Sequence, residues 1–144
     1  MQILMAAAEG LPFIKSGGLA DVIGSLPFEL TKKGHEVRVV LPLYLKIAQK
    51  HHQDFHLEKQ FCIDINYRQA QVNIWATMVK DVKFYFVEHQ GYFERESMYG
   101  YDDDGERFAY YQRAIVEMLN QLNYFPQVIH SHDWHTGMIP ALCK

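Results

Sequence analysis

The 144-residue chain has the length and composition of one globular domain, with 49% hydrophobic and 22% charged residues. Fourteen basic and seventeen acidic side chains leave a net charge of −3, which gives no electrostatic reason to expect binding to nucleic acid or to an anionic membrane. The two cysteines, Cys62 and Cys143, are too few and too far apart for a disulfide framework. With no signal peptide and no apolar run of transmembrane length, we expect a cytoplasmic protein.

The first third of the chain predicts a strand, a glycine turn and a helix. Residues 3–8 form a short apolar run that is typical of a strand buried on both faces. A polar loop follows, and apolar residues then recur at helical spacing over residues 19–33, where we expect Pro27 to bend the helix. In an open α/β sheet, the carboxyl end of a strand and the start of the next helix face the crevice where ligands bind.

The turn before this helix contains Lys15, Gly17 and Gly18. Two glycines let a diphosphate approach backbone N–H groups, and the lysine adds a positive charge. The spacing matches neither of the two common phosphate-binding fingerprints. From spacing alone, an ordinary tight turn with a surface lysine is therefore the alternative interpretation.

The middle of the chain predicts the rest of a sheet. Residues 35–41 are valine-rich and form a second strand, so that strand, helix and strand give a right-handed parallel crossover. Residues 43–54 indicate a short helix or a surface excursion. Apolar residues then alternate with polar ones over 55–87, which predicts three strands with hairpin-like breaks at 66–69 and 80–81. We interpret this segment as an antiparallel insertion whose last strand rejoins the main sheet.

The last third predicts a helix, a strand and a polar loop. Residues 106–122 form the clearest amphipathic helix, and the acidic residues 102–104 fit its solvated start better than a cation site. A short strand at 128–129 leads into the polar loop 130–137. Residues 138–144 are too short to complete a packed helix, which would leave apolar side chains unpacked: Met138, Ile139 and Leu142. The predicted class is α/β, with a Rossmann-like, mostly parallel sheet and an antiparallel hairpin insertion.

The histidine-rich loop has two interpretations. His130, His132 and His135 belong, with Asp133, to the residue types that bind zinc or iron, and they would suit a metal-dependent hydrolase. No second cluster supplies a completed ligand shell. The simpler interpretation is that Asp133 caps the following helix and that one histidine is buried, so we expect no metal site.

Three segments resemble the bacterial glycogen synthases and plant starch synthases. Residues 9–22 read EGLPFIKSGGLADV and are similar to the N-terminal signature E-x-x-P-x-x-K-[ST]-G-G-L-x-D-V of that family. Residues 132–137 read HDWHTG and are similar to its [HN]-D-W-[HQ]-[TA]-[GA] segment. Residues 99–108 resemble its tyrosine and D-x-x-R-F region. The resemblance runs in order along the whole chain.

The resemblance implies a GT-B architecture, in which two Rossmann-like domains face each other across the active site. Residues 1–144 correspond to a truncated N-terminal domain, and the C-terminal nucleotide-binding domain is absent. The implied reaction is the retaining transfer of glucose from ADP-glucose to the 4-hydroxyl at the non-reducing end of an α-1,4-glucan, without a metal or other cofactor. We expect the chain alone to be inactive and prone to self-association. A non-catalytic glucan- or nucleotide-binding module is the alternative.

The resemblance also implies roles for individual residues. Lys15 would lie at the phosphates of the nucleotide-sugar, and Gly17 and Gly18 would allow close backbone approach. Five further residues would line the cleft on the glucose and acceptor side: Glu9, Asp21, Tyr99, Asp133 and Trp134. The catalytic residues are expected in the absent part of the enzyme.

Overall fold

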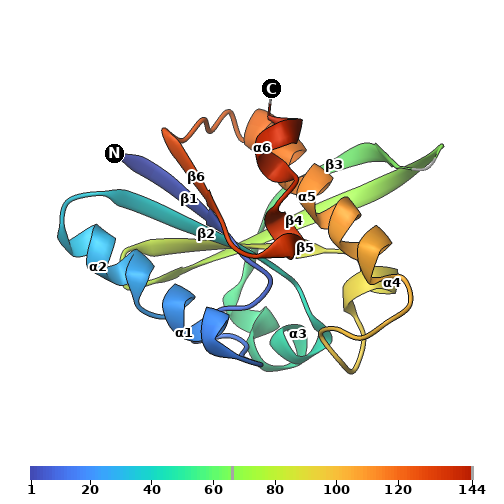
Figure 1. The fold of residues 1–144 in the computed structure, drawn as a ribbon, viewed down its shortest axis with the longest axis horizontal. Helices are drawn as coiled ribbons and strands as arrows, with labels where there is room; N and C mark the ends of the chain where they lie inside the picture. Colours follow the sequence, from blue (N-terminus) through green and yellow to red (C-terminus); the bar gives the residue numbers. More distant parts are fainter. Residues whose placement is uncertain (66, 144) are drawn as a thin grey trace.

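A six-stranded sheet forms the centre of the computed structural model, which describes residues 1–65 and 67–143 (Figure 1). The strand order is β3-β4-β5-β2-β1-β6. Four strands are parallel, namely β1 (Gln2–Ala6), β2 (Glu36–Pro42), β5 (Val82–Glu88) and β6 (Val128–Ser131). The strands β3 (His56–Ile65) and β4 (Arg68–Val79) add an antiparallel pair at one edge. The predicted class, with its antiparallel insertion and its last strand rejoining the main sheet, is confirmed.

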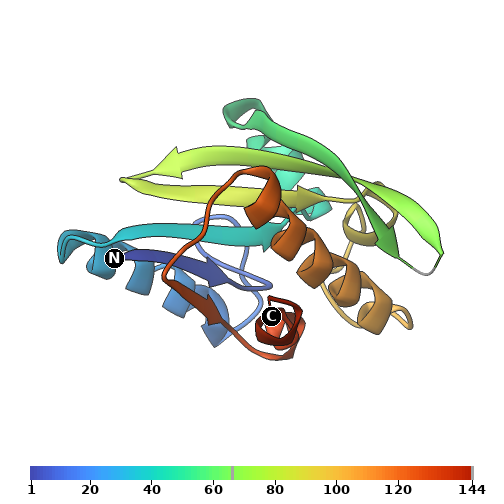
Figure 2. The same cartoon turned by 90° about the horizontal axis from the view of Figure 1, so that it is seen from above.

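Helices cover both faces of the sheet (Figure 2). The pair α1 (Gly18–Ile23) and α2 (Leu26–Lys32) connects β1 with β2, and α5 (Asp104–Gln121) connects β5 with β6. These two right-handed connections run in opposite directions along the sheet, so they lie on opposite faces. The shorter helical elements are α3 (Leu45–His51), η1 (His52–Asp54), α4 (Gln90–Phe93), η2 (Trp134–Thr136) and α6 (Ile139–Leu142). Within residues 1–65 and 67–143, none of these helices is both long enough and apolar enough to cross a membrane.

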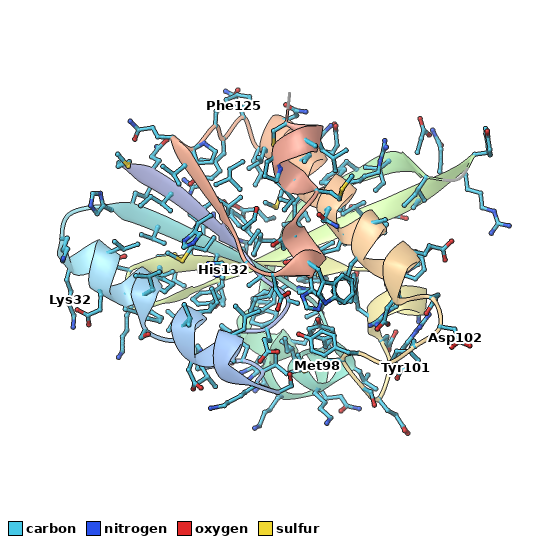
Figure 3. All side chains as sticks on the ribbon, viewed as in Figure 1. Lys32, Met98, Tyr101, Asp102, Phe125 and His132 are labelled. Atoms are coloured by element: carbon cyan, nitrogen blue, oxygen red, sulfur yellow. The ribbon has the colours of Figure 1, made fainter. Side chains whose placement is uncertain are left out.

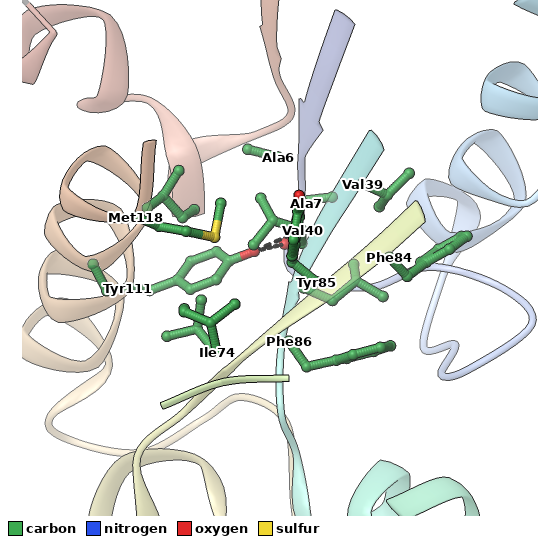
Figure 4. Packing of buried hydrophobic residues seen from close by; sticks show 14 of the residues in the cluster. Ala6, Ala7, Val39, Val40, Ile74, Phe84, Tyr85, Phe86, Tyr111 and Met118 are labelled. Carbon is green, nitrogen blue, oxygen red and sulfur yellow. Dashed lines mark hydrogen bonds between the residues drawn. The ribbon is translucent and has the colours of Figure 1, made fainter. Parts of the chain in front are cut away.

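Tyr111 fastens α5 to β2 and to the end of β1 (Figure 4). Its side chain is fully buried, and its hydroxyl lies 2.6 Å from the Ala7 carbonyl oxygen and 2.8 Å from that of Val40. Burial raises the pKa of Tyr111 well above its usual value, so the hydroxyl keeps the proton that it donates. The contact fixes the point at which the chain leaves β1 and enters the loop that follows.

The structure corrects the prediction of one helix over residues 19–33. The helix is broken at Gly24 and Ser25, and Pro27 lies in the first turn of α2, where its missing N–H needs no partner. A Cβ atom on Gly24 would lie 2.8 Å from the Cβ of Leu11, so the backbone at the break packs closely against the preceding loop. The prediction that Pro27 bends a continuous helix was wrong.

The hairpin prediction is confirmed at residues 80–81, and the prediction for the last residues is partly wrong. Lys80 and Asp81 have φ angles of 45° and 64°, as in the tight turns that join twisted antiparallel strands. At the predicted break over residues 66–69, Asn66 lies outside the described residues, as does Lys144 in the predicted unpacked tail. Ile139 is completely buried because α6 packs against α5, whereas Met138 is exposed as expected.

We expect Tyr111→Phe to lower the free energy of unfolding by about 1–2 kcal/mol, because it removes a buried donor from the Ala7 and Val40 carbonyls. Urea denaturation monitored by circular dichroism would measure the change. The matched control is Tyr67→Phe, whose ring is fully exposed and whose replacement should change stability by less than about 0.5 kcal/mol. Equal free energies of unfolding for the Tyr111→Phe variant and the wild type would show that the Tyr111 hydroxyl does not stabilise the fold.

Candidate functional site

Three loops meet at the edge of the sheet where the parallel strands end. The first loop, residues 7–17, follows β1, and the third loop, residues 132–138, follows the neighbouring parallel strand β6. The second loop, residues 94–103, leads into α5; Figure 3 labels Met98 and Tyr101 on it and His132 where β6 ends. Because β2 and β6 flank β1, the direction of the chain along the sheet reverses here, and such switch points are where open α/β sheets bind ligands. The glycine turn that follows β1 and the histidine-rich loop that follows β6 thus lie at the same edge of the sheet.

The Glu9 carboxylate holds the first loop in shape. The backbone N–H groups of Ser16 and Gly17 donate to its Oε2 at 3.0 and 2.9 Å. The hydroxyls of Ser16 and Tyr99 donate to its Oε1 at 2.7 and 3.0 Å. The side chain of Glu9 is buried, so this residue replaces water as the partner of loop groups that lie outside regular secondary structure.

These hydrogen bonds also keep Glu9 ionised. Burial alone would raise the pKa of this carboxyl, but the bonds from Ser16, Gly17 and Tyr99 outweigh burial and hold the pKa below its usual value of 4.5. The pKa of Tyr99 is raised by burial and by the neighbouring Glu9 charge, so its hydroxyl stays protonated and remains a donor. The pair is therefore a charge-assisted hydrogen bond at neutral pH.

Lys15 lies beside the glycine turn and is paired with Asp21 from α1. Its Nζ is 2.7 and 2.8 Å from the two carboxylate oxygens, and about half of each side chain is exposed. A Cβ atom on Gly17 or Gly18 would meet no protein atom within 4 Å, and neither glycine has a positive φ. The described chain itself therefore does not require glycine at these positions, which face open space two and three residues after Lys15.

A buried ion pair shapes the second loop, which carries Tyr99. The fully buried Arg107 donates from Nη1 to Asp104 at 2.7 Å and from Nε to the Tyr92 carbonyl at 2.7 Å. Asp104 in turn accepts hydrogen bonds from the backbone N–H groups of Gly100 and Tyr101 at 2.9 and 3.2 Å. The helix start predicted at the acidic run is confirmed, but Asp104 is engaged in these contacts and is not freely solvated.

The third loop presents a tryptophan over an aromatic cluster. Asp133 has a φ of 65° and a ψ of −176°, an unusual backbone conformation for a residue with a side chain. Its carboxylate accepts a hydrogen bond from the backbone N–H of Trp134 at 2.7 Å. The indole of Trp134 is 53% exposed and packs edge-on against Phe108, with ring centroids 5.2 Å apart. The buried His135 lies beneath it and stacks on Tyr99 at 4.9 Å. The exposed part of the indole is therefore accessible to a ligand.

The histidines do not assemble a metal site. Among residues 1–65 and 67–143, no group of three His, Cys, Asp or Glu side chains is arranged to hold a metal ion. Burial and the neighbouring His130 lower the pKa of His132 to about 4, and burial also lowers the pKa of His135. Both imidazoles are therefore neutral at pH 7, as the interpretation of a buried histidine requires.

The structure brings four of the eight expected site residues into two contacts. Lys15 binds Asp21, and Glu9 binds Tyr99, which connects to the third loop through His135. The backbone N–H of Gly17 donates to Glu9, although this N–H group was one that we expected the diphosphate to approach.

Sequence reasoning assigned no role to Ser16, Arg107 or Phe108. All three stand in segments that resemble the family, Ser16 in the N-terminal signature and the other two in the D-x-x-R-F region. Arg107 left a second signal, because an acidic residue three positions before an arginine in a helix indicates an ion pair on one face.

We expect Glu9→Ala to lower the free energy of unfolding by about 2 kcal/mol at neutral pH, because it removes the acceptor of the Ser16 and Gly17 amides. Glu9→Gln should cost less, since the hydroxyls of Ser16 and Tyr99 can reorient to accept from its amide NH₂. A carboxyl with a lowered pKa stabilises the fold above its unfolded-state pKa. This contribution disappears as the pH falls below 4.5 and through the folded-state pKa. The difference between wild type and Glu9→Ala, measured by urea denaturation, should therefore shrink in acid, and a difference independent of pH would contradict this role.

Comparison with known proteins assigns the chain to a family. A family model described as the starch synthase catalytic domain matches residues 2–144. The glycogen synthases of Clostridium kluyveri and of Streptococcus agalactiae serotype III are each 47% identical over all 144 residues, which correspond to 30% of the length of either relative. The catalytic domain of starch synthase IV from Arabidopsis thaliana, solved bound to ADP and acarbose, superposes with a TM-score of 0.77 at 31% identity. That superposition covers 98% of this chain and 29% of the plant protein chain.

The chain thus spans about 30% of the length of the relatives that it matches. With the signature residues gathered at the sheet edge and the family model matching almost every residue, the chain belongs to the starch synthase catalytic domain family of glycosyltransferases.

Proposed function

We propose that the chain forms the N-terminal part of a glycogen synthase, and that residues 1–144 supply one wall of its donor site. The reaction transfers glucose from ADP-glucose to the 4-hydroxyl at the non-reducing end of an α-1,4-glucan, with retention of configuration and release of ADP. The partners are ADP-glucose and glycogen, and the compartment is the cytoplasm. A second Rossmann-like domain, outside these residues, forms the opposite wall of a GT-B cleft and holds the catalytic groups.

The observation that carries the proposal is the ammonium group of Lys15 beside two glycines whose missing side chains leave open space. The leaving diphosphate gains negative charge as the bond between the anomeric carbon of the donor glucose and the diphosphate oxygen breaks. A fixed positive charge and nearby backbone N–H groups stabilise that charge most where water is excluded. Lys15 is half-exposed and paired with a half-exposed carboxylate, so the ammonium is accessible to a ligand that competes with Asp21.

The sugar side of the site consists of Asp21, Asp133 and Trp134. Glu9 and Tyr99, which were expected on the same side, are joined to each other by a hydrogen bond. Carboxylates bind sugar hydroxyls as charge-assisted acceptors, and the exposed face of an indole suits the apolar face of a pyranose. Trp134 is exposed at the same edge of the sheet as the glycine turn. The Arabidopsis relative was solved with ADP and acarbose, a nucleotide and an oligosaccharide analogue, which supports a site that takes both kinds of ligand.

In the full-length protein, Lys15→Ala should lower kcat/KM for ADP-glucose roughly ten- to a hundredfold, because it removes a charge-assisted contact to the diphosphate. Lys15→Arg should do less damage. Initial rates of ADP release at varied ADP-glucose measure the effect. Lys32→Ala is the matched control, since that lysine pairs with Glu29 on the exposed surface of α2, and it should leave the rates unchanged. Normal kinetics of the Lys15→Ala enzyme would remove Lys15 from the site.

Residues 1–144 alone should release no ADP from ADP-glucose in the presence of glycogen. Closure between two domains orients the reactants and excludes water, so the loss of one wall should exceed any effect of a single substitution. Exposed apolar residues such as Met138 should make the isolated chain self-associate, which size-exclusion chromatography would detect.

Adding the separately expressed remainder of the enzyme should restore ADP release. Steady turnover by residues 1–144 alone would contradict the two-domain proposal. Glucan binding without any restoration of turnover would favour a non-catalytic module.

A further inference from the structure

Tyr99, on the second loop, contacts both the first and the third loop of the site. Its hydroxyl donates to Glu9 in the first loop, 90 residues earlier in the chain, and its ring stacks on His135 in the third loop. The second loop is itself fixed by the buried Arg107, which donates to the Met98 carbonyl at 3.1 Å and to Asp104. A chain of contacts therefore runs from the buried guanidinium through Tyr99 to Glu9.

Glu9 has little capacity left for a sugar. A carboxylate offers about four acceptor positions, and Glu9 receives hydrogen bonds from two N–H groups and two hydroxyls. The residue is only 4% exposed. The proton of the Tyr99 hydroxyl is likewise committed to Glu9. A ligand that took either group as a direct partner would first have to break contacts that hold the first loop.

What these contacts fix is the backbone next to Lys15. Two residues, Ser16 and Gly17, separate Lys15 from the start of α1, and their backbone N–H groups donate to Glu9. The side chain of Lys15 binds Asp21 on α1. With the turn held by Glu9, its backbone and the open face of the glycines stay in one arrangement before a ligand arrives, and the ligand has only to compete with Asp21 for the Lys15 ammonium. Groups that are already in place bind without an additional ordering cost.

We propose that Glu9 and Tyr99 are positioning residues, which hold the Lys15–Gly18 turn ready for the diphosphate and do not themselves bind the glucan. This proposal rests on the proposed function above. It differs from a sugar-binding role in a measurable way. A positioning pair affects the affinity for the nucleotide even when no sugar is present, whereas a sugar ligand affects the acceptor.

The test uses Tyr99→Phe in the full-length protein, because phenylalanine keeps the ring that stacks on His135 and loses only the donor to Glu9. Calorimetric titration with ADP alone should show Kd raised about three- to tenfold, as expected for one lost hydrogen bond. The KM for glycogen at saturating ADP-glucose should stay within about twofold of the wild type. Amide hydrogen exchange at Ser16 and Gly17 should become faster, since those N–H groups lose part of their restraint.

The matched control is Tyr101→Phe, which removes a hydroxyl on the same loop whose partner is the Ser97 N–H, at 3.0 Å, and not Glu9. It should leave the ADP affinity and the exchange at residues 16 and 17 unchanged. Unchanged ADP affinity in Tyr99→Phe with a raised KM for glycogen would make Tyr99 a glucan ligand and overturn the proposal. Unchanged values throughout would also overturn it.

Failure of the proposed function itself would look different. The wild-type protein would then neither bind ADP nor release it from ADP-glucose. Amide exchange would still report whether the Tyr99 hydroxyl restrains the turn, because that measurement needs no ligand. Unaltered exchange at Ser16 and Gly17 in the variant would overturn the positioning role in that case too.

Discussion

The Glu9 carboxylate is the interaction on which the candidate site depends, because the first loop has almost no regular secondary structure to satisfy its backbone groups. By accepting from Ser16, Gly17 and Tyr99, one buried side chain defines the turn, joins it to a second loop and remains charged. An uncompensated buried carboxylate would be costly. Here the same hydrogen bonds that offset burial also give the loop its shape, so stability and site geometry have one cause.

The fold supplies the fixed frame for these loops. Two tyrosine hydroxyls fasten the chain just after β1, since Tyr111 lies 2.6 Å from the Ala7 carbonyl oxygen and Tyr44 donates to that of Ala8 at 2.6 Å. Glu9 comes directly after Ala7 and Ala8 in the chain. On the other side, Arg107 holds the second loop from inside the domain. The exposed Lys15 therefore belongs to a loop whose backbone is held by buried groups. Trp134 belongs to the third loop, where the neighbouring His135 is buried and stacks on Tyr99.

The sequence predicted the frame better than it predicted the contacts. Alternation over residues 55–87 and the amphipathic pattern over 106–122 report on local burial, and both elements formed as expected. The break at Gly24 was missed although Pro27, a residue that favours the first turn of a helix, was a local signal for a second start. The close approach of Gly24 to Leu11 left no signal in the periodicity. Ile139 was expected to lie unpacked because the surface of α5 that covers it is not visible in the local sequence. The Glu9–Tyr99 contact spans 90 residues and depends on how two irregular loops meet, so only the resemblance to a family marked both residues.

The central claim is that the Lys15–Gly18 turn receives the diphosphate of the nucleotide-sugar. A crystal structure of the full-length protein with ADP tests it most directly. We expect Lys15 Nζ within hydrogen-bond distance of a phosphate oxygen, with the phosphates over the open face of Gly17 and Gly18 and with Glu9 still bound to Ser16 and Gly17. ADP bound elsewhere, with Lys15 still paired only to Asp21, would contradict the account.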